Sequence, residues 1–375
     1  MNDPIPGNVI FESLRDKSAI VLASNARVTA GVVEGIFKAA KALDSAVIFE
    51  IARSECNLDG GYTGMTPKMY ADEVCKAAES VDFDVWSIHA DHVTVKKGTA
   101  EDITETSKLL DAQIEAGFTS FAIDASYLFN LQGGNLREEL AQNIEVTTEL
   151  AKYVETRMSG RPFGLEVEVG EIGKKDGHGH VVTTPEEAVT FVKALNENDV
   201  YPQVLAIANG ASHGNVYDEQ GNRIEQVSID IPQTVAVART LRENDLDVRI
   251  AQHGITGTPR ELIREVFPKG DIIKGNVATF WQNLVLDVYK VYQPELYRDI
   301  HNWTLEEYRP KNLGKADNEV YGKNVKYAIG QFRERIDAVD EETVATIEAL
   351  SYGEARTFIK AFGSKGTASI VRKEL

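Results

Sequence analysis

The fold is decided by the stretch Val85-Trp86-Ser87-Ile88-His89-Ala90-Asp91-His92. This stretch begins with apolar residues and ends in three ionisable side chains, which is typical of a buried strand that delivers polar groups to one edge. Histidine is scarce in the chain, with seven among 375 residues, so two histidines that flank an aspartate are conspicuous. Taken alone, the stretch is explained equally well by a polar strand end with satisfied hydrogen bonds and by a functional site.

Seven further apolar runs alternate with segments of helical periodicity before residue 280. The predicted strands span 18–24, 46–52, 84–89, 120–125, 163–169, 203–209, 247–252 and 271–276. Short continuous apolar runs are typical of strands that are covered on both faces. Eight consecutive strand–helix units favour an α/β fold with a closed (β/α)8 barrel, the TIM barrel, over an open doubly wound sheet. The first run is not followed by Gly-x-Gly-x-x-Gly, which argues against a dinucleotide-binding fold.

Helix signals lie between the predicted strands and continue beyond them. The predicted helices span 28–43, 100–116, 136–158, 184–196 and 232–243, with further helix starts at Thr66-Pro67 and Thr258-Pro259. Beyond residue 280 the chain is predicted to be all helical, with a polar, proline-containing break at 308–317. We therefore predict a catalytic barrel over 1–295 and a C-terminal helical extension over 296–375, packed on the barrel or on an oligomer partner.

Composition excludes several classes of partner. The chain has 58 acidic and 40 basic residues and a net charge of −18, which argues against nucleic acid and disfavours anionic membranes. Cys56 and Cys75 show neither metal-site spacing nor a disulfide framework, which favours a reducing compartment. No apolar run approaches the roughly 20 residues that span a bilayer, and no secretion signal is visible. We expect a cytoplasmic protein without a nucleic-acid or membrane partner.

Ionisable residues follow five of the predicted strands. They are His89, Asp91, His92, Asp124, Glu166, Glu168, His213 and His253. Because the carboxyl ends of barrel strands share one mouth, we expect these side chains to converge and to form a divalent metal site. His92, His213 and His253 are the natural ligands, and three protein ligands with an open position are typical of catalytic zinc. Co²⁺, Fe²⁺ and Mn²⁺ are alternatives to Zn²⁺.

Two segments at the same mouth are suited to anions. The segments 253–258 and 275–279 combine glycine, threonine and a predicted helix start, so their backbone N–H groups and hydroxyls can hold a phosphate. In barrels, phosphate is often bound after the last two strands. Ordinary helix caps are the alternative for each segment.

The order and spacing of these motifs resemble the class II, metal-dependent fructose- and tagatose-bisphosphate aldolases. The resemblance runs from about residue 18 to 279, and the motifs that carry it are His-x-Asp-His at 89–92, Leu-Glu-Val-Glu-Val-Gly at 165–170, His-Gly at 213–214 and 253–254, and Lys-Gly-Asn at 274–276. It implies one catalytic Zn²⁺ on the three histidines named above, and leaves open a second divalent or a monovalent cation. It also implies that Asp124 and Glu168 form an alternative or second metal position, and that Asp91 handles the proton of the substrate's C4 hydroxyl.

The same resemblance implies a sugar-phosphate substrate and a set of residues that contact it. The predicted substrate- and phosphate-binding residues are Asn25, Gly214, Gly254, Thr256, Gly257, Asn276 and Thr279. The predicted activity is reversible aldol cleavage of a phosphorylated ketose, such as fructose 1,6-bisphosphate, to dihydroxyacetone phosphate and an aldehyde, by a homodimer or homotetramer. A bound metal would supply Lewis-acid catalysis, and a neighbouring carboxylate can move the hydroxyl proton. Lys274 is the competitor, as a Schiff-base lysine.

The motifs that contact the substrate in this family are only partly present in the chain, whereas the metal-binding motifs are complete. The family's loop glutamate has no exact counterpart, because a lysine stands near its place, so Glu171 or His178 is the predicted acid or base, with Asp176 and His180 as alternatives. The family's Asn-x-Asp-Thr reads Asn-Val-Ala-Thr at 276–279, so its aspartate is missing. The usual arginine for the far phosphate is not evident, although Lys323 and Lys326 lie in its neighbourhood. These departures predict a divergent member whose substrate need not be fructose 1,6-bisphosphate. A non-catalytic or partner-dependent subunit, and a metal-dependent isomerase, hydrolase or lyase of sugar phosphates, remain alternatives.

Overall fold

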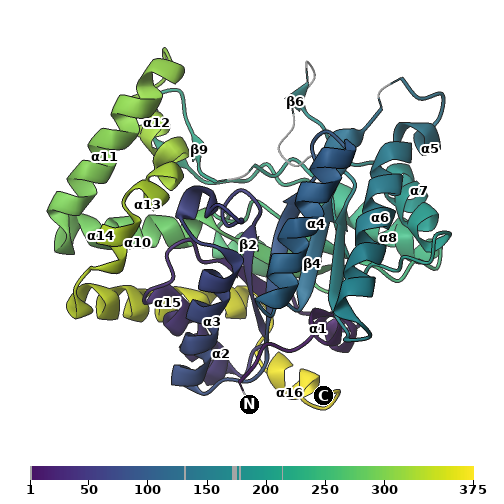
Figure 1. Cartoon of the computed structure of the whole chain (residues 1–375), viewed down its shortest axis with the longest axis horizontal. Helices are drawn as coiled ribbons and strands as arrows, with labels where there is room; N and C mark the ends of the chain where they lie inside the picture. The colour runs from purple at the N-terminus through teal and green to yellow at the C-terminus, as the bar shows by residue number, and fades with distance from the viewer. Residues whose placement is uncertain (1, 131, 171–174, 177–178, 213) are drawn as a thin grey trace.

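Eight parallel strands close into a barrel in the computed structural model (Figure 1), which describes residues 2–130, 132–170, 175–176, 179–212 and 214–375. The strands are β1 Val21–Asn25, β2 Val47–Ala52, β3 Trp86–Thr94, β4 Ser120–Asp124, β5 Gly164–Glu168, β8 Val204–Ala206, β11 Arg249–Gln252 and β12 Ile272–Val277. β1 pairs with β12 on one side and β2 on the other, which closes the ring. The predicted TIM barrel is confirmed, and each predicted strand overlaps an observed one.

Helices surround this barrel in the order that the apolar periodicity predicts. They are α2 Val32–Leu43, α3 Pro67–Val81, α4 Ala100–Glu115, α5 Leu136–Glu139, α6 Ala141–Met158, α7 Pro185–Asn196, α8 Ile231–Glu243, α9 Arg260–Val266 and α10 Thr279–Tyr292. The start signals at Thr66 and Thr184 are confirmed, because each side chain accepts a bond from the backbone N–H three residues on. The predicted helix 136–158 is interrupted at Leu140. The Thr258 start signal was wrong, because α9 begins after Pro259 without a side-chain cap.

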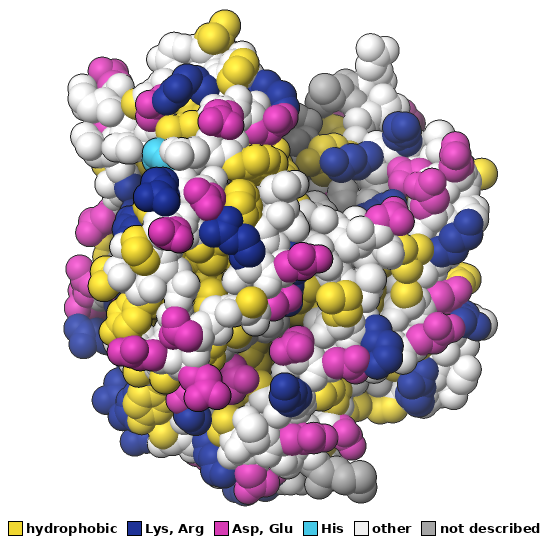
Figure 2. All heavy atoms as spheres, turned by 60° about the vertical axis from the view of Figure 1, so that its left-hand side comes forward, with side chains coloured by type: hydrophobic (Ala, Val, Ile, Leu, Met, Phe, Trp, Pro, Cys, Tyr) yellow, Lys and Arg dark blue, Asp and Glu magenta, His cyan; other side chains and the backbone are white. Residues whose placement is uncertain are grey.

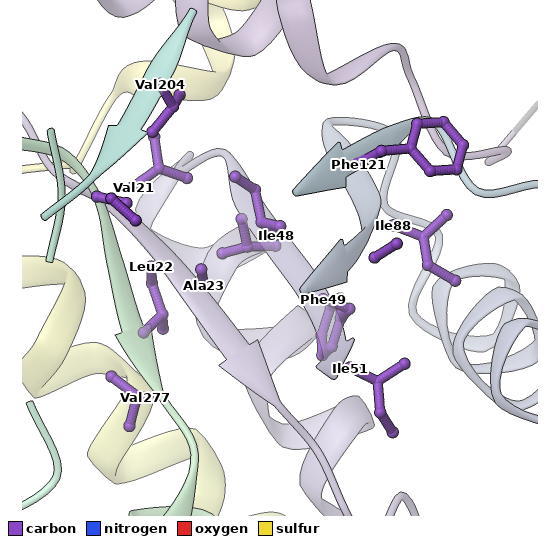
Figure 3. Close-up of a cluster of buried hydrophobic side chains, with 14 of the residues drawn as sticks. Val21, Leu22, Ala23, Ile48, Phe49, Ile51, Ile88, Phe121, Val204 and Val277 are labelled. Atoms are coloured by element: carbon purple, nitrogen blue, oxygen red, sulfur yellow. The ribbon is translucent and has the colours of Figure 1, made fainter. Parts of the chain in front are cut away.

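The barrel strands are buried except at the open end of β3, where His92 and Thr94 are partly exposed. Figure 3 shows apolar side chains of β1, β2, β3, β4 and β8 in this core. Phe37 of α2 contacts Phe49 of β2 with ring centroids 4.5 Å apart, and Trp86 of β3 meets Phe37 edge-on at 5.3 Å. Such aromatic contacts fix helix to sheet by burying large apolar areas.

A short helix, α1 Gly7–Leu14, closes the end of the barrel at which the strands begin. The sequence pattern did not reveal this helix. Gly7 lies against Ser120 and Gly164, where β4 and β5 begin, and a Cβ at Gly7 would approach Ser120 Oγ to 2.6 Å. The opposite end is therefore the open mouth. Two small hairpins stand in the loops at that mouth: β6 Lys175–Asp176 with β7 Gly179–His180, and β9 Val216–Tyr217 with β10 Arg223–Ile224.

The remaining helices form the C-terminal part of the chain. They are α11 Pro294–Tyr308, α12 Asp317–Asn324, α13 Ala328–Gln331, α14 Arg333–Asp337, α15 Glu341–Phe362 and α16 Thr367–Val371, with the 3-10 turns η3 Arg309–Lys311 and η4 Val325–Tyr327. α15 packs along α2 so closely that a Cβ at Gly35 would lie 2.6 Å from the Glu348 carbonyl oxygen. The division of the chain at residues 295 and 296 stays a prediction.

The outer surface carries charges of both signs. On the face shown in Figure 2, acidic and basic side chains are interspersed without a field of one sign. No helix within the described ranges combines the length and the apolar character that crossing a membrane requires.

Candidate active site

A bulge in β3 aims two adjacent side chains at the mouth. In a regular strand, neighbours such as Asp91 and His92 point to opposite faces. Here the pairing of β3 with β4 shifts register between Ala90 and Val93, and His92 has a φ of +40° in the left-handed region. Non-glycine residues adopt that region at a cost, and such strain gathers at functional sites. The bulge therefore lets one strand end supply both groups.

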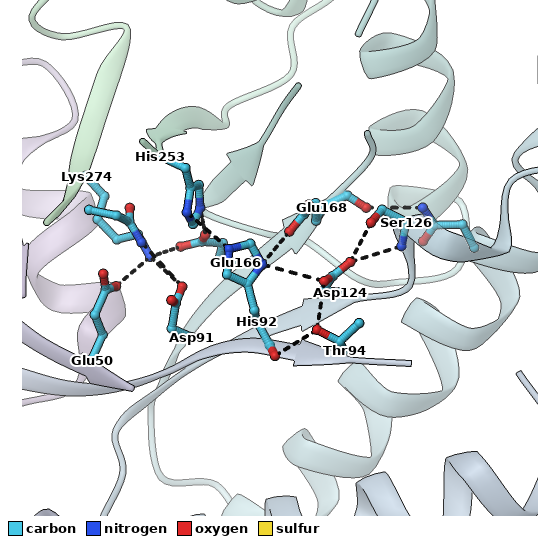
Figure 4. A network of polar contacts seen from close by, with 12 residues as sticks. Glu50, Asp91, His92, Thr94, Asp124, Ser126, Glu166, Glu168, His253 and Lys274 are labelled. Atoms are coloured by element: carbon cyan, nitrogen blue, oxygen red, sulfur yellow. Dashed lines mark hydrogen bonds and ion pairs between the residues drawn. The ribbon is translucent and has the colours of Figure 1, made fainter. Parts of the chain in front are cut away.

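Two histidines meet at the centre of the mouth (Figure 4). His92 Nε2 lies 3.1 Å from His253 Nδ1, and the two ring centroids are 4.4 Å apart. The other nitrogen of His92, Nδ1, lies 2.8 Å from Glu168 Oε2 and 3.5 Å from Asp124 Oδ2. Carboxylates behind an imidazole orient it and leave its inner nitrogen for a ligand.

The charges around His92 control its protonation. Burial alone would lower the pKa of His92, but the negative charges of Asp91 and Glu168 raise that pKa well above its usual value. Burial and the neighbouring Asp124 push the pKa of Glu168 upward, while the charge of His92 pulls it down. Burial would raise the pKa of Asp91 as well, yet the facing His92 and Lys274 hold it well below its usual range. The mouth thus holds an ionised Asp91 beside a protonated His92.

The donor atoms are suited to a divalent metal. Asp91, His92 and His253 each offer one atom, and these atoms lie within 4.8 Å of one another. Two imidazole nitrogens and a carboxylate oxygen are typical ligands of Zn²⁺ and related ions. A second group of this kind combines His92 with Asp124 and Glu168. The structure therefore brings together four of the five predicted metal residues, and His92 belongs to both groups.

A buried lysine lies close to the histidine site. Lys274 Nζ is 2.6 Å from Glu166 Oε2, 3.0 Å from Glu50 Oε2 and 3.2 Å from His89 Nε2, inside the barrel. Burial would lower the pKa of Lys274, but Glu166 and Glu50 raise it above its usual value. A lysine held in the charged form is a poor nucleophile, which argues against a Schiff base here.

Two amides hold Asp91 from the neighbouring strands. Asn25 Nδ2, at the end of β1, donates to Asp91 Oδ2 at 3.0 Å, and Asn276 Nδ2, in β12, donates to Asp91 Oδ1 at 3.3 Å. The carbonyl oxygen of Asn276, Oδ1, is buried without a hydrogen-bond partner among the described residues. A buried acceptor without a hydrogen bond lowers the stability of the protein. A ligand hydroxyl group that donates to Asn276 Oδ1 would remove this cost.

The mouth opens into a cavity of about 830 Å³, which is large enough for a sugar phosphate. Six of the seven predicted substrate-binding residues line it: Asn25, Gly214, Gly254, Thr256, Asn276 and Thr279. Gly257 does not line this cavity and lies against Gln226 instead. The predicted residues Glu171, His178 and His213 lie outside the described residues, as do the side chains of Asp176 and His180.

Sequence reasoning missed a second polar cluster at the mouth. Glu55 Oε1 accepts from Arg27 Nε at 2.7 Å and from the Tyr62 hydroxyl at 2.9 Å, and all three residues line the cavity. Arg27 Nη1 also donates to Thr279 Oγ1 at 3.1 Å. The position of Arg27 in the sequence could have indicated its role. Arg27 lies two residues after β1, and side chains that follow a barrel strand are expected to enter the mouth.

The fold is shared with several solved structures. The YdjI aldolase of Escherichia coli K12 is 16% identical, with a TM-score of 0.60 over 97% of this chain and 99% of that one. The fructose-bisphosphate aldolase of Campylobacter jejuni is 18% identical, with a TM-score of 0.58 over 98% and 97% of the two chains. The fructuronate-tagaturonate epimerase UxaE of Cohnella laeviribosi is 13% identical, with a TM-score of 0.62 over 99% of this chain and 83% of that one.

Comparison with sequence profiles of protein families identifies the family of the chain as well as its fold. The profile of the family described as fructose-bisphosphate aldolase class-II matches residues 7–337, which include the barrel and every described residue of the histidine site. Families of this class are generally metal-dependent, in agreement with the donor groups at the mouth. With residues 7–337 matched, the chain belongs to the class II fructose-bisphosphate aldolase family.

Proposed function

We propose that the protein cleaves a phosphorylated ketose reversibly to dihydroxyacetone phosphate and an aldehyde. The observation that carries this proposal is the convergence of His92, His253 and Asp91 beside a cavity with a glycine-lined rim. We also propose that it acts in the cytoplasm as a homodimer or homotetramer. The alternative is a non-catalytic or partner-dependent subunit, which would bind the metal but would not cleave a ketose phosphate without its partner.

The proposed metal is Zn²⁺, held by His92 and His253 with His213 as the third histidine. A Lewis-acidic ion at this place would draw electrons from the substrate's ketone group. Asp124 and Glu168, next to His92, are proposed as the second metal position. These two carboxylates also orient the His92 ring through Nδ1.

Asp91 is the proposed proton acceptor. It is ionised, and the amides of Asn25 and Asn276 fix both of its oxygens, so its orientation is set before substrate arrives. In cleavage, Asp91 takes the proton of the C4 hydroxyl while the C3–C4 bond breaks and C4 becomes the aldehyde carbon. The electron pair of the broken bond stays with the three-carbon fragment, and C3 then takes a proton from Glu171 or His178.

The phosphate of the three-carbon half is proposed to bind at the glycine turns. Gly214 and Gly254 line the cavity and have φ values of +82° and +70°, in the left-handed region that favours glycine. α10 begins at Thr279 without a side-chain cap from Ala278, and its dipole favours an anion. Thr256 and Thr279 add hydroxyl groups at the same rim.

Retro-aldol activity tests the proposal directly. We expect Zn²⁺-loaded protein to release an aldehyde, trapped with hydrazine, from at least one compound in a panel of ketose 1-phosphates and 1,6-bisphosphates. EDTA should abolish the signal and added Zn²⁺ should restore it. An isomerase would consume the ketose without a trapped aldehyde, and a non-catalytic subunit would bind Zn²⁺ and consume nothing, so either result would refute the proposal.

Metal binding should tighten as pH rises. The raised pKa of His92 means that its ring carries a proton at neutral pH when no metal is bound, whereas a metal needs the neutral ring. Each displaced proton makes the apparent affinity for Zn²⁺ rise about tenfold per pH unit until the pH passes the raised pKa. Competition with a chelator at pH 6, 7 and 8 measures this slope. An affinity that is flat over that range would contradict the proposed role of His92.

A further inference from the structure

The loop between β8 and α8 contains the β9–β10 hairpin, and we call residues 214–230 of this loop the strap. Near the start of the strap, Asn215 and Asn283 of α10 exchange hydrogen bonds, the shorter of which runs from Asn283 Nδ2 to Asn215 Oδ1 at 2.9 Å. At the hairpin turn, Gly221 lies so close to Ala316 that a Cβ would not fit. The strap is therefore anchored to α10 and to the residue before α12.

One side chain near the end of the strap is buried. Residues 222–228 are exposed except for Gln226, which is 1% exposed. Its backbone N–H donates to the Gly257 carbonyl oxygen at 2.9 Å, and its side-chain Nε2 donates to the Gly254 carbonyl oxygen. Gln226 thus bonds to both ends of the turn 254–257 that follows β11.

The orientation of the Gln226 amide is fixed by its partner. If Nε2 and Oε1 were exchanged, an amide oxygen would face the Gly254 carbonyl oxygen, and two acceptors repel each other. Oε1 is buried and has no hydrogen-bond partner among the described residues, which lowers stability. An apolar side chain of similar size would avoid that cost, so the Nε2–H bond to the turn is what glutamine contributes here.

This bond sets the direction of a backbone N–H group in the turn. The C=O and N–H groups of a trans peptide point in opposite directions, and the described residues include no cis peptide bond. With the Gly254 carbonyl held by Gln226, the N–H of Ile255 points away from the strap. That N–H donates to none of the described residues. It stands between Gly254 and Thr256, which both line the cavity.

The turn is also held from its other neighbours. Thr256 Oγ1 accepts from the N–H of Phe280 in α10 at 3.2 Å. Within the turn, the Thr258 N–H donates to the Ile255 carbonyl oxygen at 2.9 Å. Gln226 therefore completes a set of bonds that fixes the turn before a ligand arrives, and it does so from a segment that follows a different strand.

We propose that Gln226 is a positioning residue for the phosphate of the three-carbon half, because it holds the turn 254–257 with the Ile255 N–H free to donate to that phosphate. The inference rests on the proposed function, which places the phosphate at this turn. Gln226 does not line the cavity, so it acts through the turn and not on the substrate.

Kinetics of a Gln226→Met variant test this role. Methionine fills a similar space but cannot donate to the Gly254 carbonyl oxygen. For any ketose phosphate that the wild type cleaves, we expect KM to rise about 3- to 10-fold, since one hydrogen bond contributes a factor of about this size. The value of kcat should stay within about twofold, because the phosphate is bound equally in the ground state and the transition state. A purely structural residue would lower kcat through loss of folded enzyme and leave KM unchanged, and that result would overturn the inference.

Gln220→Met is the matched control, because it makes the same substitution at an exposed glutamine of the strap outside the cavity. It should leave KM and kcat unchanged. Gln226→Glu is a second variant, which keeps the side-chain shape and puts an oxygen against the Gly254 carbonyl oxygen. At pH 8 it should raise KM at least as much as Gln226→Met. Wild-type affinity for Zn²⁺ would show that the histidine site of either variant is folded, and an unchanged KM in both variants would overturn the inference.

Phosphate binding separates this inference from the proposed function. Calorimetry with inorganic phosphate and EDTA-treated protein should show an affinity about 3- to 10-fold weaker in Gln226→Met and unchanged in Gln220→Met, whether or not any compound is cleaved. Phosphate binding that depends on Gln226, without release of an aldehyde from any ketose phosphate, would refute the aldolase proposal and leave the inference standing. Release of an aldehyde with unchanged KM and phosphate affinity in Gln226→Met would do the reverse.

Discussion

Replacement of Asp91 by asparagine should abolish turnover and leave the metal in place. The amide keeps the shape of the side chain between Asn25 and Asn276, but it cannot accept the C4 hydroxyl proton. Loss of a positioned general base typically costs about 10²- to 10⁴-fold, so kcat should fall by roughly 10³. Aldehyde trapping measures the rate, and metal analysis of the same sample measures bound Zn²⁺.

Glu105→Gln is the control for Asp91→Asn, because Glu105 lines the same cavity as an exposed carboxylate without a described ion pair. It should have the wild-type rate. A normal rate in Asp91→Asn would refute the proton-transfer role. Loss of both rate and Zn²⁺ would show instead that Asp91 acts as a ligand, as its place in the donor group with His92 and His253 allows.

Replacement of His92 by alanine should remove the metal and the activity together. His92 belongs to both donor groups that contain predicted metal residues, and the remaining group of described residues, Glu50, His89 and Asp91, surrounds the charged Lys274. It is also the cation between Asp91, Asp124 and Glu168. Breaking a buried ion pair by deleting one partner costs about 3–5 kcal/mol of stability, so the variant should also unfold at a lower temperature than the wild type when both are metal-free.

The variant His92→Asn separates loss of a metal ligand from loss of the fold. Asparagine tolerates positive φ and keeps a polar group in place, so this variant is expected to fold. We expect it to be folded by circular dichroism, with an affinity for Zn²⁺ at least about 100-fold below that of the wild type, as loss of one ligand predicts. His301→Ala is the control, because His301 packs between Tyr297 and Tyr321 in the C-terminal helices. Retention of wild-type affinity in His92→Asn would exclude His92 from the ligand set.

The barrel and the meeting of His92 with His253 could be predicted from sequence for one physical reason. Parallel strands covered on both faces leave a distinctive apolar run, and polar residues just after each run must share the mouth. His92 lies near the end of β3 and His253 directly follows β11, two strands far apart in sequence, yet their ring nitrogens lie 3.1 Å apart. The family membership was also predicted correctly, because its motifs lie at these same strand ends.

Features that depend on local irregularity or on distant packing were not predictable. The bulge at His92 leaves no mark in the apolar pattern, although it alone lets Asp91 and His92 face the same way. The placement of Lys326 depends on η4 packing against a turn more than 260 positions earlier in the chain, at Tyr62. Gly257 lies against Gln226 and does not line this cavity, a placement that depends on packing between distant segments.

The packing of α15 on α2 has a consequence for how the nascent chain folds. Gly31 and Gly35 lie against the backbone of Val344 and Glu348, and the Ile20 N–H, just before β1, donates to the Phe362 carbonyl oxygen at 3.0 Å. During synthesis, β1 and α2 therefore lack their contacts with α15, which is synthesised more than 300 residues later. Because apolar surface left exposed during synthesis promotes aggregation, the β1–α2 segment is a stretch that a chaperone would protect until translation passes residue 362.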